Sequence, residues 1–297
     1  MSHIHIRKLI ESRSDYAGRS WSYDFRSIPA ICQEEAVTQT CQRLLQGIAP
    51  ITKDWDDAKN SEWISRIYFA AKMILSSSVM AQSLEFATAK NLRSVTSYLD
   101  YYTVLNTLRA ILLTNPHVAW DGGALLETTH TKTINVAVGI VSQFDKGTAE
   151  EANKHITHLK AFRELISYRA PSSGDAFPKP AIDVIAFCKL CAEIAQMQSE
   201  LFEASLHKNA KGTFSLSTEA IQHICNVEID GVHFYDKEDS YRMGYLQRKY
   251  PLPTNILHIM SEGHVEDFFG SWCAKGEDEA EGQFDPDDNW RILFDVP

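Results

Sequence analysis

The sequence lacks the apolar run of a membrane span. No stretch of the 297 residues reaches the length of about 18 consecutive apolar residues that a crossing helix needs. The first residues, Met1 to His5, contain no apolar run either, so we expect no secretory signal peptide. Cysteine is sparse, with 6 residues in the whole chain. We therefore predict a cytoplasmic protein with reduced thiols and no membrane contact.

A basic excess is also missing, and this limits the partners to expect. The chain carries 29 Lys and Arg residues against 39 Asp and Glu residues, and its formal net charge is −10. Broad, non-specific DNA binding needs a basic surface, so this balance argues against it. The balance leaves open a local basic pocket.

The common catalytic signatures are absent too. The sequence has no Gly-x-x-x-x-Gly-Lys, Gly-x-Gly-x-x-Gly, Gly-x-Ser-x-Gly or His-Glu-x-x-His motif, which removes the usual signals of phosphate loops, serine hydrolases and zinc proteases. His155 and His158 can share a helix face, and Cys188 and Cys191 have metal-site spacing, but no further ligands are arranged near either pair. We favour a solvated helix flank and buried core thiols, and we predict no metal and no cofactor.

Helical periodicity dominates the middle of the chain. From Pro29 to His207 apolar residues recur at helical spacing. Gly47 and Pro50 are expected to end the first helix, and a capping box at Thr148 predicts the start of another. The predicted helices lie near residues 29–45, 60–87, 90–114, 125–144, 148–168 and 181–207. We therefore predict an all-α fold, a helical bundle over residues 30–207.

The two ends of the chain differ from this bundle. Residues 1–29 are polar and aromatic, and we predict an N-terminal arm folded onto the body. Residues 208–297 are predicted to form a small mixed C-terminal subdomain, with a short helix near 217–226, a β-like stretch near 227–235 and a helical part near 254–273.

An acidic run lies near the C-terminus, ahead of an apolar cluster. Its acids are Glu277, Asp278, Glu279, Glu281, Asp285, Asp287 and Asp288, and the apolar residues that follow are Trp290, Ile292, Leu293 and Phe294. Such charge density favours a solvated, partly disordered linker. The alternative is a docking tail, whose apolar end packs on its own domain or on a protein partner.

The predicted helix 90–114 contains one cation that breaks its pattern. We expect a water-facing stripe of Arg93, Thr96, Asp100, Thr103 and Thr107, and a core-facing arc of Val95, Tyr98, Leu99, Tyr102, Leu105, Leu112 and Leu113. Arg109 falls in the middle of this apolar arc, and Asn106 lies on its flank. A buried guanidinium is costly unless it is paired. Arg109 therefore has a partner, lines a cleft, or reaches the helix end, where the dipole favours a cation.

Residues 94–113 read Ser-Val-Thr-Ser-Tyr-Leu-Asp-Tyr-Tyr-Thr-Val-Leu-Asn-Thr-Leu-Arg-Ala-Ile-Leu-Leu, and His130 follows at the start of the next helix region. This pattern resembles the second helix of HEPN-superfamily proteins, nearest to the YaaC-like members, over about residues 60–170. The resemblance implies a helical bundle that forms a homodimer and often cuts RNA without a metal. The nuclease members use an Arg with a closely following His. No such pair occurs here, because Arg109 and His117 are separated by 7 residues that include Pro116.

Two functions follow from these observations. The first is a HEPN-like protein that acts on or around RNA, such as a bacterial toxin or antiphage effector. In it Arg109 would clamp a phosphate, His130 would be the general acid or base, and Asn106 and Tyr102 would orient them. The alternative is a non-catalytic scaffold that binds a protein partner through its C-terminal region. An approach of Arg109 to His130 within hydrogen-bond range in a solvent-reached cleft would favour the first. An Arg109 that only caps its helix, with His130 pointing away, would favour the alternative.

Overall fold

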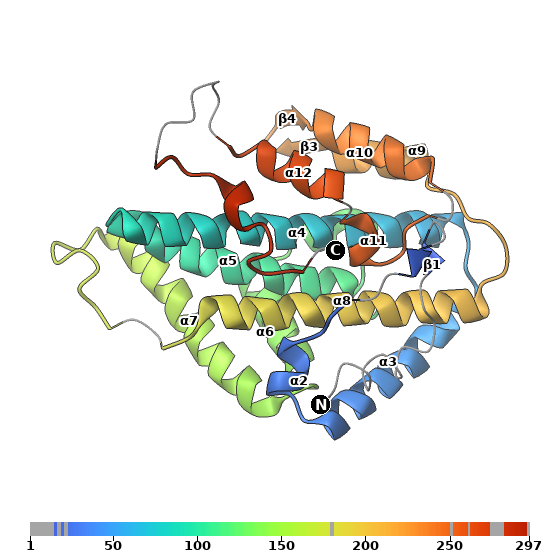
Figure 1. Ribbon diagram of the computed structural model, residues 1–297, viewed down its shortest axis with the longest axis horizontal. Coiled ribbons are helices and arrows are strands. Elements are labelled where there is room, and N and C mark those ends of the chain that lie inside the picture. Colours follow the sequence, from blue (N-terminus) through green and yellow to red (C-terminus); the bar gives the residue numbers. More distant parts are fainter. Residues whose placement is uncertain are drawn as a thin grey trace.

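Two long helices lie side by side at the centre of the molecule. The computed structural model describes residues 15–16, 19–20, 23–178, 181–249, 252–260, 262–273 and 282–295. Within it α4 (Asp57–Ala89) and α5 (Arg93–Thr114) run antiparallel and share the most extensive helix contact (Figure 1). The expected mostly helical fold is confirmed.

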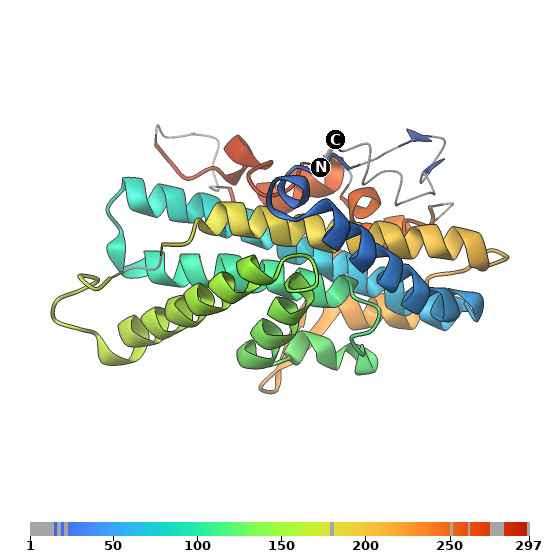
Figure 2. The ribbon, with the colours of Figure 1, turned by 90° about the horizontal axis from the view of Figure 1, so that it is seen from below.

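The other long helices surround α5. Figure 2 shows α8 (Val184–Asn209) on one side of α5, with α6 (His130–Val141) and α7 (Lys146–Arg169) on the other, while α3 (Glu34–Lys53) crosses α8. The arrangement leaves α5 enclosed on several sides. Within the described residues, no helix combines the length and the apolar character that crossing a membrane requires.

The predicted faces of α5 are wrong in part, although Leu105, Leu112 and Leu113 are buried as expected. Thr96, Thr103 and Thr107 are buried instead of facing water, and Val95 is exposed. The threonine hydroxyls are buried at little cost because they bond to carbonyls of their own helix, as Thr103 Oγ1 does to Leu99 O at 2.6 Å. An enclosed helix has no water-facing stripe, so the polar pattern misassigned its orientation.

Three predicted helix boundaries also need correction. The first predicted helix is split into α2 (Ser27–Ile31) and α3, and α3 continues through Gly47 and Pro50 because its last turns pack on α8, where Thr52 Oγ1 meets Ser205 Oγ at 2.9 Å. The helix expected over 125–144 begins only at His130, after the 3-10 turn η1 (Asp121–Glu127). Asp145, not Thr148, caps α7, since its Oδ1 accepts from the Thr148 amide at 2.7 Å.

Beyond α8 the chain lies across α4, as Figure 1 shows. It forms α9 (Thr218–Cys225), the hairpin β3 (Asn226–Ile229) and β4 (Val232–Tyr235), α10 (Lys237–Gln247), α11 (Ile256–Ile259), α12 (Glu262–Gly270) and η2 (Pro286–Asn289). Asp230 and Gly231 both have positive φ, as a tight hairpin turn requires, so the predicted β-like stretch is confirmed. Helix α10 was not predicted, and the single helical part expected over 254–273 is divided.

The two ends of the described chain meet in the core. A short hairpin, β1 (Asp15–Tyr16) with β2 (Arg19–Ser20), precedes the buried Tyr23 and Phe25. The Tyr23 ring contacts that of Phe294 with centroids 4.5 Å apart, and Ile292 and Leu293 are buried beside them. The apolar end of the acidic tail therefore packs on its own chain. Glu277, Asp278, Glu279 and Glu281 lie outside the described residues.

Candidate functional site

His130 is held at the point where α5, α6 and α7 converge. It is the first residue of α6, whose start is fixed because the hydroxyl of Thr129 accepts from the Lys132 amide at 3.4 Å. The His130 Nδ1 atom lies 3.0 Å from the Tyr101 hydroxyl, and either atom can donate. The Tyr102 ring meets the imidazole edge-on, with centroids 5.9 Å apart. These contacts leave Nε2 as the ring nitrogen available to a ligand.

A cation from α7 covers the same two tyrosines. The Arg163 guanidinium lies 5.3 Å from the Tyr101 ring centre and 5.9 Å from that of Tyr102. Its side chain is mostly buried, and it forms an ion pair with Glu164 at 3.5 Å. Arg163 Nε is buried and has no hydrogen-bond partner among the described residues. A buried donor without a partner is unusual in a folded protein and suits a site that receives an acceptor from outside.

The surrounding charges keep His130 neutral. Partial burial lowers the pKa of His130, and the positive charges of Arg109, Arg163 and Lys160 lower it further. Burial also raises the pKa of Tyr101 to about 12, so its hydroxyl keeps its proton at neutral pH. The result is an uncharged imidazole among cations, which is the form that can accept a proton.

Arg109 is near this cluster but does not bond to it. Its charge acts on His130, yet no hydrogen bond or ion pair joins its guanidinium to any group in the described part of the chain. Burial lowers the pKa of Arg109. The carbonyls at the end of α5 bind Arg66 instead, whose Nε donates to Leu113 O at 2.8 Å. Arg109 thus lines a cavity of about 530 Å³ and does not cap its helix.

The predicted site residues separate into two groups. His130 and Tyr102 lie in contact, and Arg109 is close enough to influence His130. Asn106 is buried against α4, where its amide donates to Ser76 Oγ at 3.2 Å. It therefore fixes the packing of α5 on α4 and makes no hydrogen bond to the other three in the described chain.

A second cavity, of about 700 Å³, lies between α4, α10 and α12. Both of its described cations are paired with carboxylates. Lys72 forms an ion pair with Asp239, which also accepts from the Tyr68 hydroxyl at 2.7 Å, and Arg242 lies 2.6 Å from Asp267. Because these cations already have carboxylate partners, the cavity is a weaker candidate for an anionic ligand than the His130 cluster.

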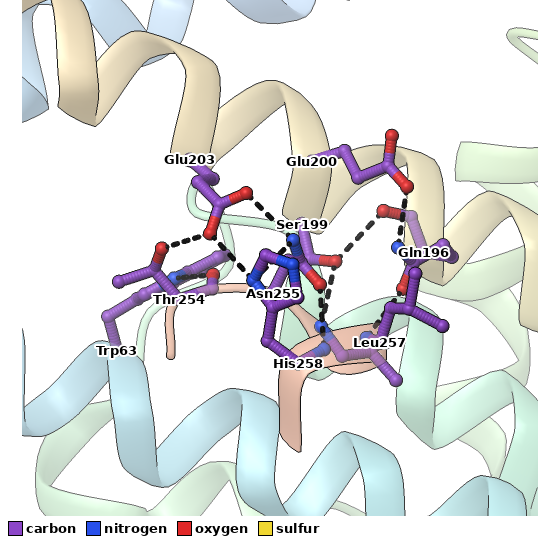
Figure 3. Close-up of polar contacts among 10 residues, drawn as sticks. Trp63, Gln196, Ser199, Glu200, Glu203, Thr254, Asn255, Leu257 and His258 are labelled. Carbon is purple, nitrogen blue, oxygen red and sulfur yellow. Dashed lines mark hydrogen bonds and ion pairs between the residues drawn. The ribbon is translucent and has the colours of Figure 1, made fainter. Parts of the chain in front are cut away.

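A third polar group joins α8 to the segment before α11 (Figure 3). Glu203 accepts from Thr254 Oγ1 at 2.6 Å and from Asn255 Nδ2 at 2.7 Å, and it pairs with His258 Nδ1 at 3.3 Å. Hydrogen bonds to this carboxylate and the His258 charge lower its pKa against the opposing effect of burial. Both side chains of the pair are nearly inaccessible to solvent, so this network holds the fold and cannot meet a substrate.

The histidine pair and the cysteine pair with metal-site spacing lie on a helix flank and in the core, respectively, as expected. His158 is exposed on α7, with His155 half-buried beside it. Cys188 and Cys191 are fully buried, and burial raises the pKa of both thiols. The described residues contain no group of three or more His, Cys, Asp and Glu side chains placed to hold a metal ion.

Sequence reasoning missed Tyr101, Arg163 and Lys160 as members of the cluster. The Tyr101–Tyr102 pair was visible within the quoted motif, but the contact of α7 with α5 was not predictable from spacing. The basic residues near the end of α7, Arg163 and Arg169, were the one sign in the sequence that this helix could contribute cations to a site. Comparisons of the chain with family models, curated proteins and solved structures found no match.

Proposed function

We propose that this protein is a HEPN-like RNA-binding protein that cleaves RNA at the cluster formed by α5, α6 and α7. The observation that carries the proposal is the neutral His130, bonded to Tyr101 and placed among Arg163, Lys160 and Arg109. A phosphodiester needs cations to hold it and a neutral base to start the reaction, and this cluster supplies both.

Three features favour a phosphate beside His130. The N-terminus of α6 presents free amide groups and the positive end of its dipole. Arg163 has a buried donor without a partner among the described residues, and a guanidinium matches phosphate oxygens in pairs. The third feature is Lys160, whose Nζ donates to Thr131 Oγ1 at 3.0 Å and so places a positive charge at the start of α6. The net acidity of the whole chain would confine RNA to this local basic patch.

The chemistry requires only proton transfer and charge stabilisation. In the tautomer whose Nδ1–H donates to the Tyr101 oxygen, Nε2 of His130 has its lone pair free. It would take the proton of a ribose 2′-hydroxyl while the 2′-oxygen attacks phosphorus and the bond to the 5′-oxygen breaks. The imidazolium would then protonate the leaving oxygen. The products would be a 2′,3′-cyclic phosphate and a 5′-hydroxyl, with Arg163 countering the charge of the transition state.

The test is cleavage of end-labelled single-stranded RNA by the wild type and by His130→Ala. Loss of a general base should reduce the rate by about 10²–10⁴-fold. His158→Ala is the matched control, because this histidine is exposed on α7. An RNA with 2′-O-methyl groups should resist cleavage. If the wild type leaves RNA intact, or if His130→Ala cuts it equally fast, the nuclease proposal is wrong.

A cellular test addresses the proposed setting in bacterial defence. Expression of the wild type in a bacterial host should reduce growth or phage yield, and His130→Ala should relieve either effect. Equal effects from the two proteins would assign the phenotype to something other than cleavage.

The alternative, an interaction protein that forms a homodimer, is favoured by one surface. Val227, Ile229, Val232, Phe234 and Tyr235 of the β3–β4 hairpin are all exposed. A two-stranded sheet with apolar side chains on its surface and open edges can pair with the same hairpin of a second copy. Sedimentation of the wild type and of Phe234→Glu tests this: a dimer that dissociates in the variant supports it, and a monomeric wild type excludes it.

A further inference from the structure

The cavity that Arg109 lines has the dimensions of a small-molecule site. Its volume of about 530 Å³ is ample for a nucleoside. Helices α4 and α5 supply one wall, and the opposite side is formed by η1 and β3. At Gly123 a side chain would lie 2.3 Å from the His223 ring, so this wall needs the glycine, whose φ is also positive.

Much of the cavity lining is apolar, and the described lining holds a single arginine. Phe69, Met73, Leu112 and Leu126 line it together with Arg109. The guanidinium has no hydrogen bond or ion pair among the described residues, and burial lowers its pKa against the opposing effect of Tyr101 and Tyr102. None of the acceptors that line the cavity bonds to its planar set of donors in the described chain, so a ligand with two adjacent acceptor atoms would complete it.

The carboxylates around the opening decide the charge of that ligand. Asp121, Glu127 and Glu228 also line the cavity, and all three are exposed. Three negative charges against one positive charge oppose the entry of a free anion. The same carboxylates accept hydrogen bonds from N–H groups. The ligand that fits is uncharged and planar, with acceptors on one edge and donors on the other.

We propose that this cavity binds a guanine base, presented by the RNA that the proposed function cleaves. The O6 and N7 atoms of guanine are the paired acceptors that Arg commonly reads. Its N1–H and amino group are donors for a carboxylate such as Glu127, and its faces would lie between the apolar walls. Adenine carries an amino group in place of O6, so it would set donor against donor at Arg109.

The position of the cavity links it to the cleavage site. Glu127 is three residues before His130 along the chain, and the Arg109 charge acts on His130. A base seated against Arg109 would therefore place its own backbone near the His130 cluster. The inference rests on the proposed function and narrows it to cleavage next to guanosine.

The test is calorimetric titration of the full chain with guanosine, which has no phosphate and so does not report on the Arg163 cluster. A ligand of this size should bind with a Kd on the order of 10⁻⁵–10⁻⁴ M. Adenosine should bind at least about tenfold more weakly. Arg109→Met and Arg109→Lys should each lose guanosine at least about tenfold, because neither keeps the planar pair of donors. Arg169→Met, on the exposed end of α7, is the matched control.

His130→Ala should bind guanosine like the wild type, so failure of cleavage and failure of this pocket are read separately. Benzoate probes the competing possibility of an anion site. Equal binding of adenosine, tighter binding of benzoate, or unchanged guanosine binding in Arg109→Met would each overturn the proposal. Should Arg109→Met fail to fold, Glu127→Gln serves instead, with weakened guanosine binding as the expected result and unchanged binding as the contrary one.

Discussion

The network at Glu203 and the cluster at His130 use similar side chains under opposite conditions. Glu203 and His258 are fully buried, and the carboxylate meets His258, Thr254 and Asn255 (Figure 3). Around His130 the cations outnumber their partners, and the Arg163 Nε has none among the described residues. Complete pairing explains why the first group tolerates burial, whereas the second group has capacity left for a ligand.

This difference distinguishes residues that stabilise the fold from residues that are available to bind a ligand. Removing one partner of a buried pair leaves the other charged and desolvated, so stability falls. Removing a cation that has no partner leaves no buried group unpaired, and it reduces the repulsion between neighbouring cations. The free energy of unfolding should therefore be unchanged or higher. The predictions below apply this contrast.

The largest expected effect is on Glu203. Glu203→Ala leaves His258 and Asn255 buried without their acceptor, and it should lower the free energy of unfolding by about 3–5 kcal/mol. Chemical denaturation measures this. Glu219→Ala, at an exposed position in α9, should change it by less than about 0.5 kcal/mol. Similar values for the two variants would remove the distinction between the two regions.

A buried histidine outside both groups gives the next effect, through pH. His264 stacks on Tyr68 and its Nδ1 lies 3.2 Å from Ile259 O. Burial, then the charges of Arg242 and Lys72, lower its pKa to about 4. Between pH 4 and the usual value near 6.5 the unfolded chain binds more protons, so stability falls as pH falls through this window. The loss should reach about 1.4 kcal/mol per pH unit.

His264→Phe keeps the ring and should flatten the stability profile from about pH 6.5 to 4. The Glu203 carboxylate, whose pKa is lowered, loses its contribution only as pH falls below about 4.5, so the two effects separate. A wild-type protein equally stable at pH 6.5 and 4.5 would contradict the neutral, buried state of His264.

Arg163 supplies the opposite test. Arg163→Met should change the free energy of unfolding by less than about 1 kcal/mol, because its ion pair with the half-exposed Glu164 is weak. RNA affinity should fall, and the slope of log affinity against log salt should decrease by about 1. Fluorescence titration of labelled RNA at several salt concentrations measures both. Strong unfolding with unchanged RNA binding would place Arg163 with Glu203 as a structural residue.

The smallest effect concerns Lys160. Its charge helps to lower the pKa of His130, so Lys160→Met should raise that pKa. Proton NMR titration of the imidazole follows the change. Lys154→Met, on an exposed part of α7, should leave the His130 titration as it is. An unchanged pKa after loss of Lys160 would mean that its charge does not act on His130.

Periodicity was sufficient for the helices and insufficient for their orientations. The apolar spacing located α4, α5 and α8 because long helices need an extended apolar surface. It failed at Pro50 and at Thr107, where contacts with α8 override local propensity and polar pattern. The position of Arg109 inside an apolar arc did point to a cavity. Arg163 could not be paired with Tyr101 from sequence, since their contact depends on how α7 crosses α5.

The Tyr23–Phe294 contact has a consequence for synthesis on the ribosome. The amide of Asp295 donates to the Tyr23 hydroxyl across 272 positions of the chain. The backbone amides at the start of α2 donate to the carboxylate of Glu193, which is also translated much later. Tyr23 and Phe25 are therefore synthesised long before Glu193, Phe294 and Asp295. Until those later residues have been translated, the two aromatic side chains lack these native contacts. The native core closes only after translation has passed Phe294, so the growing chain carries an exposed aromatic segment that chaperones can bind.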